Sequence, residues 1–271
     1  MTLITLSYKK SDIDINSNGI VCFADSLASN TTNPEMAITE QAMKIVSLSC
    51  CYEINFKEYP QLHHNEIGIA FAGNISIAMQ TYNIARIACR HIQPTPNSLP
   101  NNCPSIHSIA TLIAQILEYY YKKYAFLILE SAKTEMVVFG FCYRNKKFVA
   151  YHLKPEIIEN SARIIVEDTD ITNISYFSFG SGAKDFNDYV KENPSNNLQT
   201  NFRNFIKSDI AKKKGVGGYV QKCFVNFGHF FYFMDVDSET LDIRQGQIGG
   251  FTFNNCFLDD YIVLFPMHPW L

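Results

Sequence analysis

The sequence predicts an α+β protein, a four-layer αββα sandwich in which two antiparallel sheets pack face to face and helices cover both outer sides. Two observations carry this prediction. Segments with alternating apolar residues, which are typical of strands, come in three groups along the chain. Two pairs of helical segments separate those groups. Sheets and helices each have an apolar face to bury, and this stacking buries all of them.

The first group contains four predicted strands. TLITLSY (2–8) alternates apolar and polar residues, and GIVCFAD (19–25) follows it after SDIDINSNG (11–19), which is rich in turn residues. These segments predict a hairpin with a long tip. MKIVSL (43–48) is the third strand, and NEIGIAFAG (65–73), which ends in glycine, is the fourth.

The first helical pair follows. ISIAMQTYNIARIACRHI (75–92) has apolar residues at helical spacing, and three prolines between 94 and 100 end that element. SIHSIATLIAQILEYYYKK (105–123) predicts a strongly amphipathic helix. The residues along its apolar face are Ile106, Ile109, Ile113, Ile116 and Leu117.

The second half repeats the alternation of strands and helices. The predicted strands are EMVVFGFCY (135–143), KFVAYHL (147–153) and SYFSFGSG (175–182); the helices are AKDFNDYVKE (183–192) and LQTNFRNFIKSDIAKKK (198–214); the closing strands are GGYVQKCFVNF (217–227), HFFYFMDV (229–236) and ETLDIRQ (239–245). We expect a single domain over residues 1–271, with an insertion around 50–66 and an irregular apolar tail over 257–271.

Composition narrows the class of function. The 271 residues are 47% hydrophobic and 18% charged, with a net charge of −3, so a basic face for nucleic acid is not expected. No apolar run approaches the length of a membrane span, and the N-terminus lacks the pattern of a secretory signal. We therefore expect a cytoplasmic protein that binds neither nucleic acid nor membrane.

The eight cysteines are expected to be reduced, because no export signal accompanies them. None belongs to a CxxC pair. Cys89 lies two residues from His91, and His63 adjoins His64, but neither pair has the second half of a zinc site. We expect no metal and no cofactor.

Five short motifs follow one another along the chain. They are Thr2 at the start of the first strand, FADS (23–26), QAMKIV (41–46), FAGN (71–74) and FGSGAKDF (179–186). In this respect the sequence resembles the proteasome β-subunit family of N-terminal nucleophile hydrolases, which includes the HslV peptidase and the Anbu group. The resemblance extends from Thr2 to about Val220, with the same order of elements, and it implies the fold of that family.

The resemblance assigns a role to each matching residue. It implies that Thr2 is the nucleophile once Met1 is removed, and that Asp25 pairs with a catalytic lysine, Lys44. It also implies that the N–H of Gly73 binds the oxyanion and that Ser181 lies near the free amine.

The chemistry of these residue types agrees with such roles. A threonine hydroxyl is a weak nucleophile near neutral pH and needs a base. A free α-amine, with an ordinary pKa of about 8, can accept the hydroxyl proton, and a nearby Lys⁺ would lower that pKa. A carboxylate such as Asp25 would keep Lys44 charged and oriented.

Simpler interpretations exist for each motif. Asp25 can end a strand in a turn, Lys44 can be a solvated residue before a strand, and Gly73 can merely end a strand. Ser181 can be the N-cap of a helix.

By the same resemblance, seven residues form the first specificity pocket: Ala28, Ser29, Ala42, Val46, Phe71, Ile75 and Met79. Apart from Ser29 these side chains are apolar, and none can pair with a charge. A buried charge without a partner is costly, so we expect the pocket to prefer apolar substrate residues.

The sequence also departs from the family. The tip after Ser7 is longer than usual, and CCYEINFKEYPQLHHN (50–65) is an extra segment that we expect either to cover the cleft or to contact another subunit. Many family members carry an acidic residue and a serine where this chain has Lys213 and Val216.

The expected function is that of a threonine peptidase acting on a peptide or protein substrate within a homo-oligomeric ring or spiral. The alternatives are an inactive scaffold subunit of the same fold and a stand-alone amidohydrolase for small amides. A phosphate-binding loop is absent from the sequence, so an ATPase unfoldase would be a separate chain.

Overall fold

A computed structural model describes most of the chain. The described residues are 2–12, 17–29, 37–39, 42–56, 59–94, 103–128, 133–158, 161–194, 197–233 and four strand segments at 247–248, 251–252, 257–258 and 261–262. Within the described helices, none is both long and apolar enough to cross a membrane.

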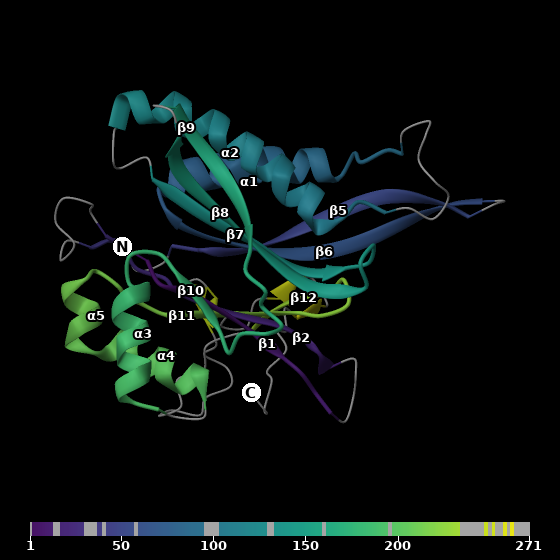
Figure 1. The fold of residues 1–271 in the computed structure, drawn as a ribbon. Helices are drawn as coiled ribbons and strands as arrows, with labels where there is room; N and C mark the ends of the chain where they lie inside the picture. The colour runs from purple at the N-terminus through teal and green to yellow at the C-terminus, as the bar shows by residue number, and fades with distance from the viewer. Residues whose placement is uncertain are drawn as a thin grey trace.

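Two five-stranded sheets form the centre of the molecule. The first has the strand order β10-β1-β2-β11-β12 and the second the order β5-β6-β7-β8-β9. Helices α1 and α2 cover the outer face of the second sheet, and α3, α4 and α5 lie on the outer side of the first (Figure 1). The predicted αββα sandwich is confirmed.

Sheet one combines strands from the beginning of the chain with strands from residues 177–233. Its strands are β1 (Ile4–Lys9), β2 (Gly19–Asp25), β10 (Phe177–Phe179), β11 (Val220–Val225) and β12 (Phe230–Phe233). All neighbours pair antiparallel. Ile4 lies opposite both Ala24 and Phe179, so the start of β1 has β2 on one side and β10 on the other.

Sheet two is an antiparallel meander. Its strands are β5 (Ile45–Phe56), β6 (Tyr59–Gly73), β7 (Thr134–Cys142), β8 (Lys147–Ile158) and β9 (Ser161–Asp168). The sequence did not predict β9, an edge strand that is only partly buried. Glu118 of α2 covers this edge, because its Oε2 accepts a hydrogen bond from the Ile164 N–H at 3.0 Å. The short strands β3 (Ala28–Ser29) and β4 (Ala37–Thr39) were also not predicted.

Within the described part of the chain, five helices complete the layers. They are α1 (Ile75–Cys89), α2 (Ile106–Ile128), α3 (Ala183–Glu192), α4 (Leu198–Lys207) and α5 (Asp209–Lys213). One helix was predicted over 198–214, whereas the structure has two helices, α4 and α5, with Ser208 between them. The Ser208 hydroxyl accepts from the Ala211 N–H at 3.3 Å and so caps α5.

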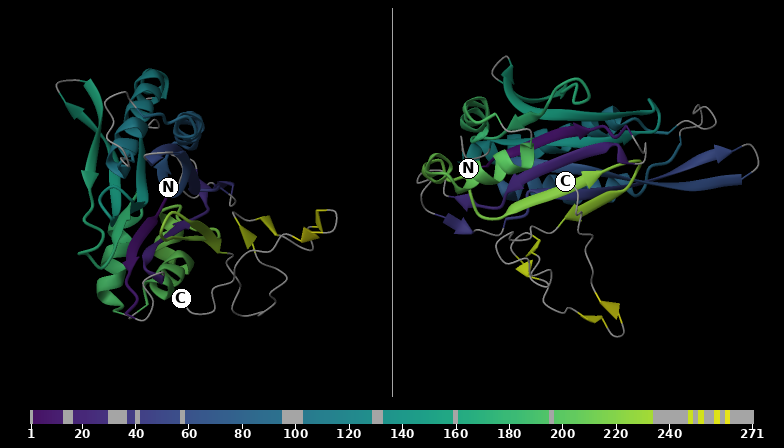
Figure 2. Two further views of the ribbon diagram at one scale, coloured as in Figure 1. Left: turned by 90° about the vertical axis from the view of Figure 1, so that its right-hand side faces the viewer. Right: turned by 90° about the horizontal axis from the view of Figure 1, so that it is seen from below.

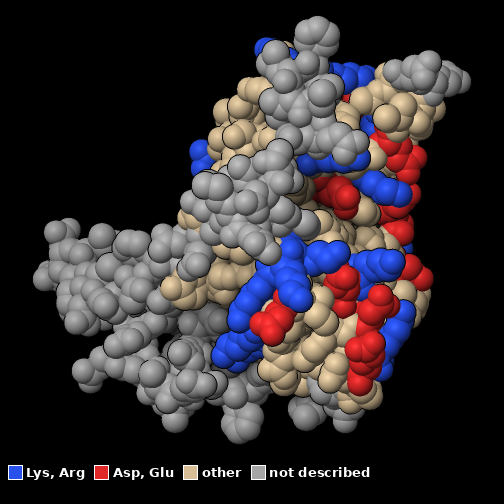
Figure 3. Space-filling view, turned by 90° about the vertical axis from the view of Figure 1, so that its left-hand side faces the viewer, with Lys and Arg blue, Asp and Glu red and all other residues tan. Residues whose placement is uncertain are grey.

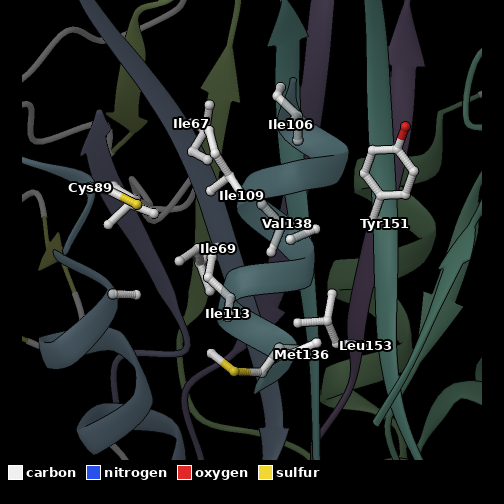
Figure 4. Packing of buried hydrophobic residues seen from close by; sticks show 14 of the residues in the cluster. Ile67, Ile69, Cys89, Ile106, Ile109, Ile113, Met136, Val138, Tyr151 and Leu153 are labelled. Atoms are coloured by element: carbon white, nitrogen blue, oxygen red, sulfur yellow. The ribbon is translucent and has the colours of Figure 1, made fainter. Parts of the chain in front are cut away.

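Three apolar clusters fill the spaces between layers, because strand residues alternate between faces. Ile4, Leu6 and Cys22 face sheet two, whereas Leu3 and Val21 face α3 and α4. The third cluster lies between sheet two and α1–α2. Figure 4 shows isoleucines of α2 packed over side chains of β6, β7 and β8.

The segment around 50–66 continues the β5–β6 hairpin. Residues pair along its length up to Phe56 and Tyr59, and Figure 1 shows this part extending beyond the body. A strand rises about 3.4 Å per residue, so the twelve residues of β5 place its far end roughly 40 Å from Lys44. The hairpin therefore does not cover Lys44 of its own chain. Contact with another subunit stays a prediction.

The C-terminal part is described only in short pieces. β13 (Gln247–Ile248) pairs with β14 (Phe251–Thr252), and β15 (Phe257–Leu258) pairs with β16 (Tyr261–Ile262); all four lie outside the sandwich (Figure 2). The tail was expected to be irregular, whereas two of its dipeptides pair in a hairpin. The predicted strand at 239–245 lies outside the described residues, and a single domain for the whole chain stays a prediction.

Candidate active site

Thr2 is buried directly before β1, beside the segment that follows β10. The Thr2 main-chain nitrogen donates a hydrogen bond to Ser181 Oγ at 3.1 Å, and the Thr2 carbonyl accepts one from the Gly182 N–H at 3.1 Å. The pairing of β1 with β10 brings these residues together across 179 positions of sequence. Ser181 is not the N-cap of α3; Gly182 occupies that position.

Gly180 allows this close approach. A Cβ at Gly180 would lie 2.5 Å from the Thr2 carbonyl oxygen and 3.2 Å from the Ala72 Cβ, and its φ is +90°. Both features favour glycine. The same contact shows that Ala72, at the end of β6, lies next to Thr2.

Asp25 connects the threonine to the lysine. Its fully buried carboxylate accepts hydrogen bonds at Oδ1 from the Leu3 N–H (2.8 Å) and from Lys44 Nζ (2.8 Å), and at Oδ2 from the Gly217 N–H (3.2 Å). Because Leu3 directly follows Thr2, Asp25 fixes the start of β1 relative to the ammonium group.

Lys44 is 1% exposed. Its Nζ donates to Asp25 Oδ1 and, at 2.6 Å, to the Leu27 carbonyl. Burial lowers the pKa of Lys44 from its ordinary value, and the charge and hydrogen bond of Asp25 offset part of that shift. The interpretation of Lys44 as a solvated residue is therefore wrong.

Gly73 ends β6, and its φ of +103° is in the region that favours glycine. A Cβ there would overlap the Lys133 carbonyl oxygen, which also accepts a hydrogen bond from the Asn74 N–H at 3.1 Å. Asn74 is the N-cap of α1, since its Oδ1 accepts from the Ile77 N–H. The end of β6, Gly73 and the start of α1 are therefore held in place beside Ala72 and Thr2.

The predicted pocket residues lie in two places. Val46 and Phe71 are buried in the cluster under α1, and Ile75 and Met79 pack against that cluster. The Phe71 N–H donates to the Lys44 carbonyl at 3.0 Å, so this apolar group adjoins the lysine.

Ala28 and Ala42 are buried elsewhere, in the connection between β2 and β5, with Ala42 N–H bonded to the Ser26 carbonyl. Ser29 pairs with Ala37 through the backbone of β3 and β4.

Sequence reasoning missed several groups around the ion pair. Gly217 donates to Asp25 and accepts from the Leu27 N–H at 2.9 Å, and Gln221 bonds to the main chain of Lys44. The paired glycines of KKKGVGGYV were the available signal. Val216 is fully buried and packs in the cluster that contains Leu3, and Lys213 is exposed on α5.

The surface near this end carries charges of both signs (Figure 3). Lys214 lies 3.7 Å from Asp185, and Lys212 lies 3.7 Å from Asp209. Among the described residues, no three histidine, cysteine, aspartate or glutamate side chains gather as metal ligands would.

Comparisons with known proteins support the fold. No family model matches the sequence, and no curated protein is similar to it in sequence. Solved structures do share the fold. Anbu (ancestral beta-subunit) from Yersinia bercovieri has 13% identity and a TM-score of 0.50, over 83% of this chain and 81% of that one.

Two further structures are similar. The helical assembly of the Anbu complex from Pseudomonas aeruginosa has 12% identity and a TM-score of 0.54, over 88% of this chain and 89% of that chain. The Anbu (Gly-1) mutant from Hyphomicrobium sp. strain MC1 has 10% identity and a TM-score of 0.53, over 86% and 87%. At these identities the likeness shows a proteasome-like fold and nothing finer.

Proposed function

We propose that this protein is an N-terminal threonine hydrolase of the proteasome β-subunit type, which cleaves peptide bonds with Thr2 after removal of Met1. The observation that supports it most is the buried Lys44–Asp25 ion pair, bonded through Asp25 to the residue next to Thr2. Burying two charges costs free energy that their mutual attraction often does not recover, so a functional role explains this ion pair better than a gain in stability does.

The reaction begins at the threonine. Removal of Met1 converts the Thr2 nitrogen, which is already bonded to Ser181 Oγ, into an α-amine. The neutral amine accepts the hydroxyl proton, and the hydroxyl oxygen attacks the substrate carbonyl. The amine then passes the proton to the departing amine of the substrate, and water hydrolyses the ester left on Thr2.

The remaining groups act by charge and position. Lys44⁺ lowers the pKa of the α-amine, which keeps more of it neutral near pH 7, and stabilises the developing alkoxide. Asp25 holds Lys44 in its charged form. Gly73 supplies the N–H that receives the oxyanion.

The apolar group beside Lys44 forms part of the substrate pocket. Val46 of β5 and Phe71 of β6 belong to one apolar cluster, Ile75 and Met79 of α1 pack against that cluster, and none of the four carries a charge. We therefore assign a preference for apolar residues before the scissile bond.

Oligomerisation is part of the proposal. The Anbu complex from Pseudomonas aeruginosa, one structural neighbour, forms a helical assembly, and we propose for this protein a homo-oligomeric ring or spiral in the cytoplasm that confines the site. An ATPase unfoldase, if the protein uses one, is a separate chain.

An inactive scaffold subunit is the second candidate. It is favoured by Val216, whose fully buried side chain packs with apolar neighbours and cannot hydrogen-bond the amine. A stand-alone amidohydrolase differs from the main proposal in its oligomeric state and in the size of its substrates.

The test compares Thr2→Ala with Thr5→Ala. Both remove a buried hydroxyl from the start of sheet one, but Thr5 bonds to Ser178 and has no proposed role. Intact mass must first show that Met1 is absent. Thr2→Ala should then abolish cleavage of fluorogenic peptides, whereas Thr5→Ala should keep it. Undiminished turnover by Thr2→Ala would contradict the proposal, and a wild type without Met1 and without turnover would favour the scaffold.

A further inference from the structure

Gln221 of β11 is a buried side chain with three hydrogen bonds to main-chain atoms. Its Nε2 donates to the Ala42 carbonyl at 2.6 Å and to the Asp25 carbonyl at 3.5 Å. Its Oε1 accepts from the Lys44 N–H at 2.9 Å. One amide group thus joins the end of β2 to the residues on either side of Met43.

These hydrogen bonds matter because they connect the two sheets beside the candidate site. Asp25 ends β2 in sheet one, whereas Lys44 immediately precedes β5 in sheet two. Strand pairing within either sheet cannot fix one relative to the other. Gln221 lies opposite Ala24 in sheet one, whose side chain faces sheet two, so the glutamine side chain reaches across the layer between the sheets.

Glutamine suits this task because its amide both donates and accepts. The contact needs two donated bonds, to the carbonyls of Ala42 and Asp25, and one acceptor for the Lys44 N–H. An aliphatic side chain of equal length would leave these buried groups without that partner, which is costly inside a protein.

We propose that Gln221 is a positioning residue of the candidate active site, which holds the main chain of residues 42–44 against β2 and thereby fixes the Lys44 ammonium between Asp25 and Leu27. Its consequence for catalysis rests on the proposed function. The positioning of Lys44 does not, so the two can fail separately.

The test uses Gln221→Met, which keeps the length of the side chain and removes its hydrogen bonds. Folded protein is treated with an amine-reactive succinimidyl ester, and modification at each lysine is followed by peptide mapping. The rate at Lys44 should rise at least tenfold. Lys222, the next residue on β11 and also buried, should keep its rate.

A matched control is Gln80→Met. Gln80 of α1 donates through Nε2 to the Tyr124 hydroxyl at 3.0 Å, so this variant loses a comparable amide at a distance from Lys44. Its Lys44 should react as slowly as in the wild type. Gln221→Asn, which stays polar but is one methylene short, replaces Gln221→Met if the latter does not fold.

Activity gives a second readout. Displacing Lys44 should lower kcat/KM at pH 7 at least tenfold and shift the rising limb of the pH profile upward, because the ammonium would no longer lower the pKa of the α-amine. A purely structural loss would scale the profile without shifting it.

The outcomes separate the two claims. Increased reactivity at Lys44 alone supports the positioning role, even if the wild type proves to have no turnover and the proposed function fails. Unchanged reactivity at Lys44, or an equal rise at Lys222, would overturn the positioning role.

Discussion

The site end and the middle of the β5–β6 hairpin differ in how their buried polar groups are bound. At the site end, Lys44 bonds through Nζ and N–H to Asp25, Leu27 and Gln221. About midway along the hairpin, where β6 has left β7 beyond Gly68, Asn65 lies opposite Cys50 and His63 opposite Tyr52. The Nε2 atom of His63 and the Oδ1 atom of Asn65 are buried there without a hydrogen-bond partner among the described residues.

This difference separates buried polar side chains that hydrogen bonds hold in place from buried polar atoms that no hydrogen bond holds. At the site, partners come from β2 and from β11, 177 residues away in sequence. A network in which each member has its partners fixes one arrangement. A buried polar atom without a partner costs free energy and does not hold its side chain in one arrangement. Substitutions should therefore be costly at the site end and mild at the unpartnered side chains in the middle of the hairpin.

The largest effect is expected from Lys44→Ala. The variant leaves the Asp25 carboxylate buried without its cation, which should lower the free energy of unfolding by about 3–5 kcal/mol. Cleavage should fall by at least about two orders of magnitude. Denaturant unfolding and peptide turnover measure the two effects.

The matched control for that variant is Lys213→Ala. Lys213 is exposed on α5, near the same end, so its loss should change stability by no more than about 0.5 kcal/mol. Equal losses of unfolding free energy in the two variants would contradict a specific contribution of the buried ion pair to stability.

The second prediction concerns alkaline pH. In the proposed mechanism Lys44 acts as a cation, and burial lowers its pKa from the ordinary 10.5. Activity should therefore fall as pH rises, with a midpoint below 10.5, while near-ultraviolet circular dichroism shows that the protein is still folded. Activity that persists unchanged above that pH would disprove a role for the Lys44 charge.

The third prediction is substrate preference, tested with peptides that differ only at the residue before the scissile bond. Leu or Tyr should be cleaved faster than Arg or Glu, because Val46 and Phe71 offer no partner for a charge. Among apolar residues the discrimination should be about 1–3 kcal/mol. Faster cleavage after Arg or Glu would mean that the pocket lies elsewhere.

The smallest effect is expected in the middle of the hairpin, from Asn65→Leu. Since Asn65 Oδ1 has no partner to lose, the free energy of unfolding should change by less than about 1 kcal/mol or increase. Gln221→Met, a similar change at the site, should cost more than that. If thermal and denaturant unfolding rank these variants in the opposite order, the contrast between the site and the middle of the hairpin is wrong.

The sequence predicted much of the fold because its signals are local. Alternation predicted β1, short apolar segments predicted β2, β6 and β7, and helical spacing predicted α1 and α2. The edge strand β9 was missed because its exposed residues, such as Arg163, do not follow the alternation of a half-buried strand. The break at Ser208 was missed because a serine within a helical pattern can also be tolerated there.

For the candidate site, the sequence by itself determined which chemical groups stand at the ends of strands: Thr2, Asp25, Lys44 and Gly73. These positions can be predicted from sequence because the end of a strand is a local feature of the pattern. Only the tertiary structure decided that Lys44 is buried rather than solvated, that Ser181 bonds to Thr2 rather than capping α3, and that Gln221 joins the two sheets. Such contacts depend on how two sheets stack, and the residues that make them lie up to 196 positions apart, beyond the reach of any local pattern.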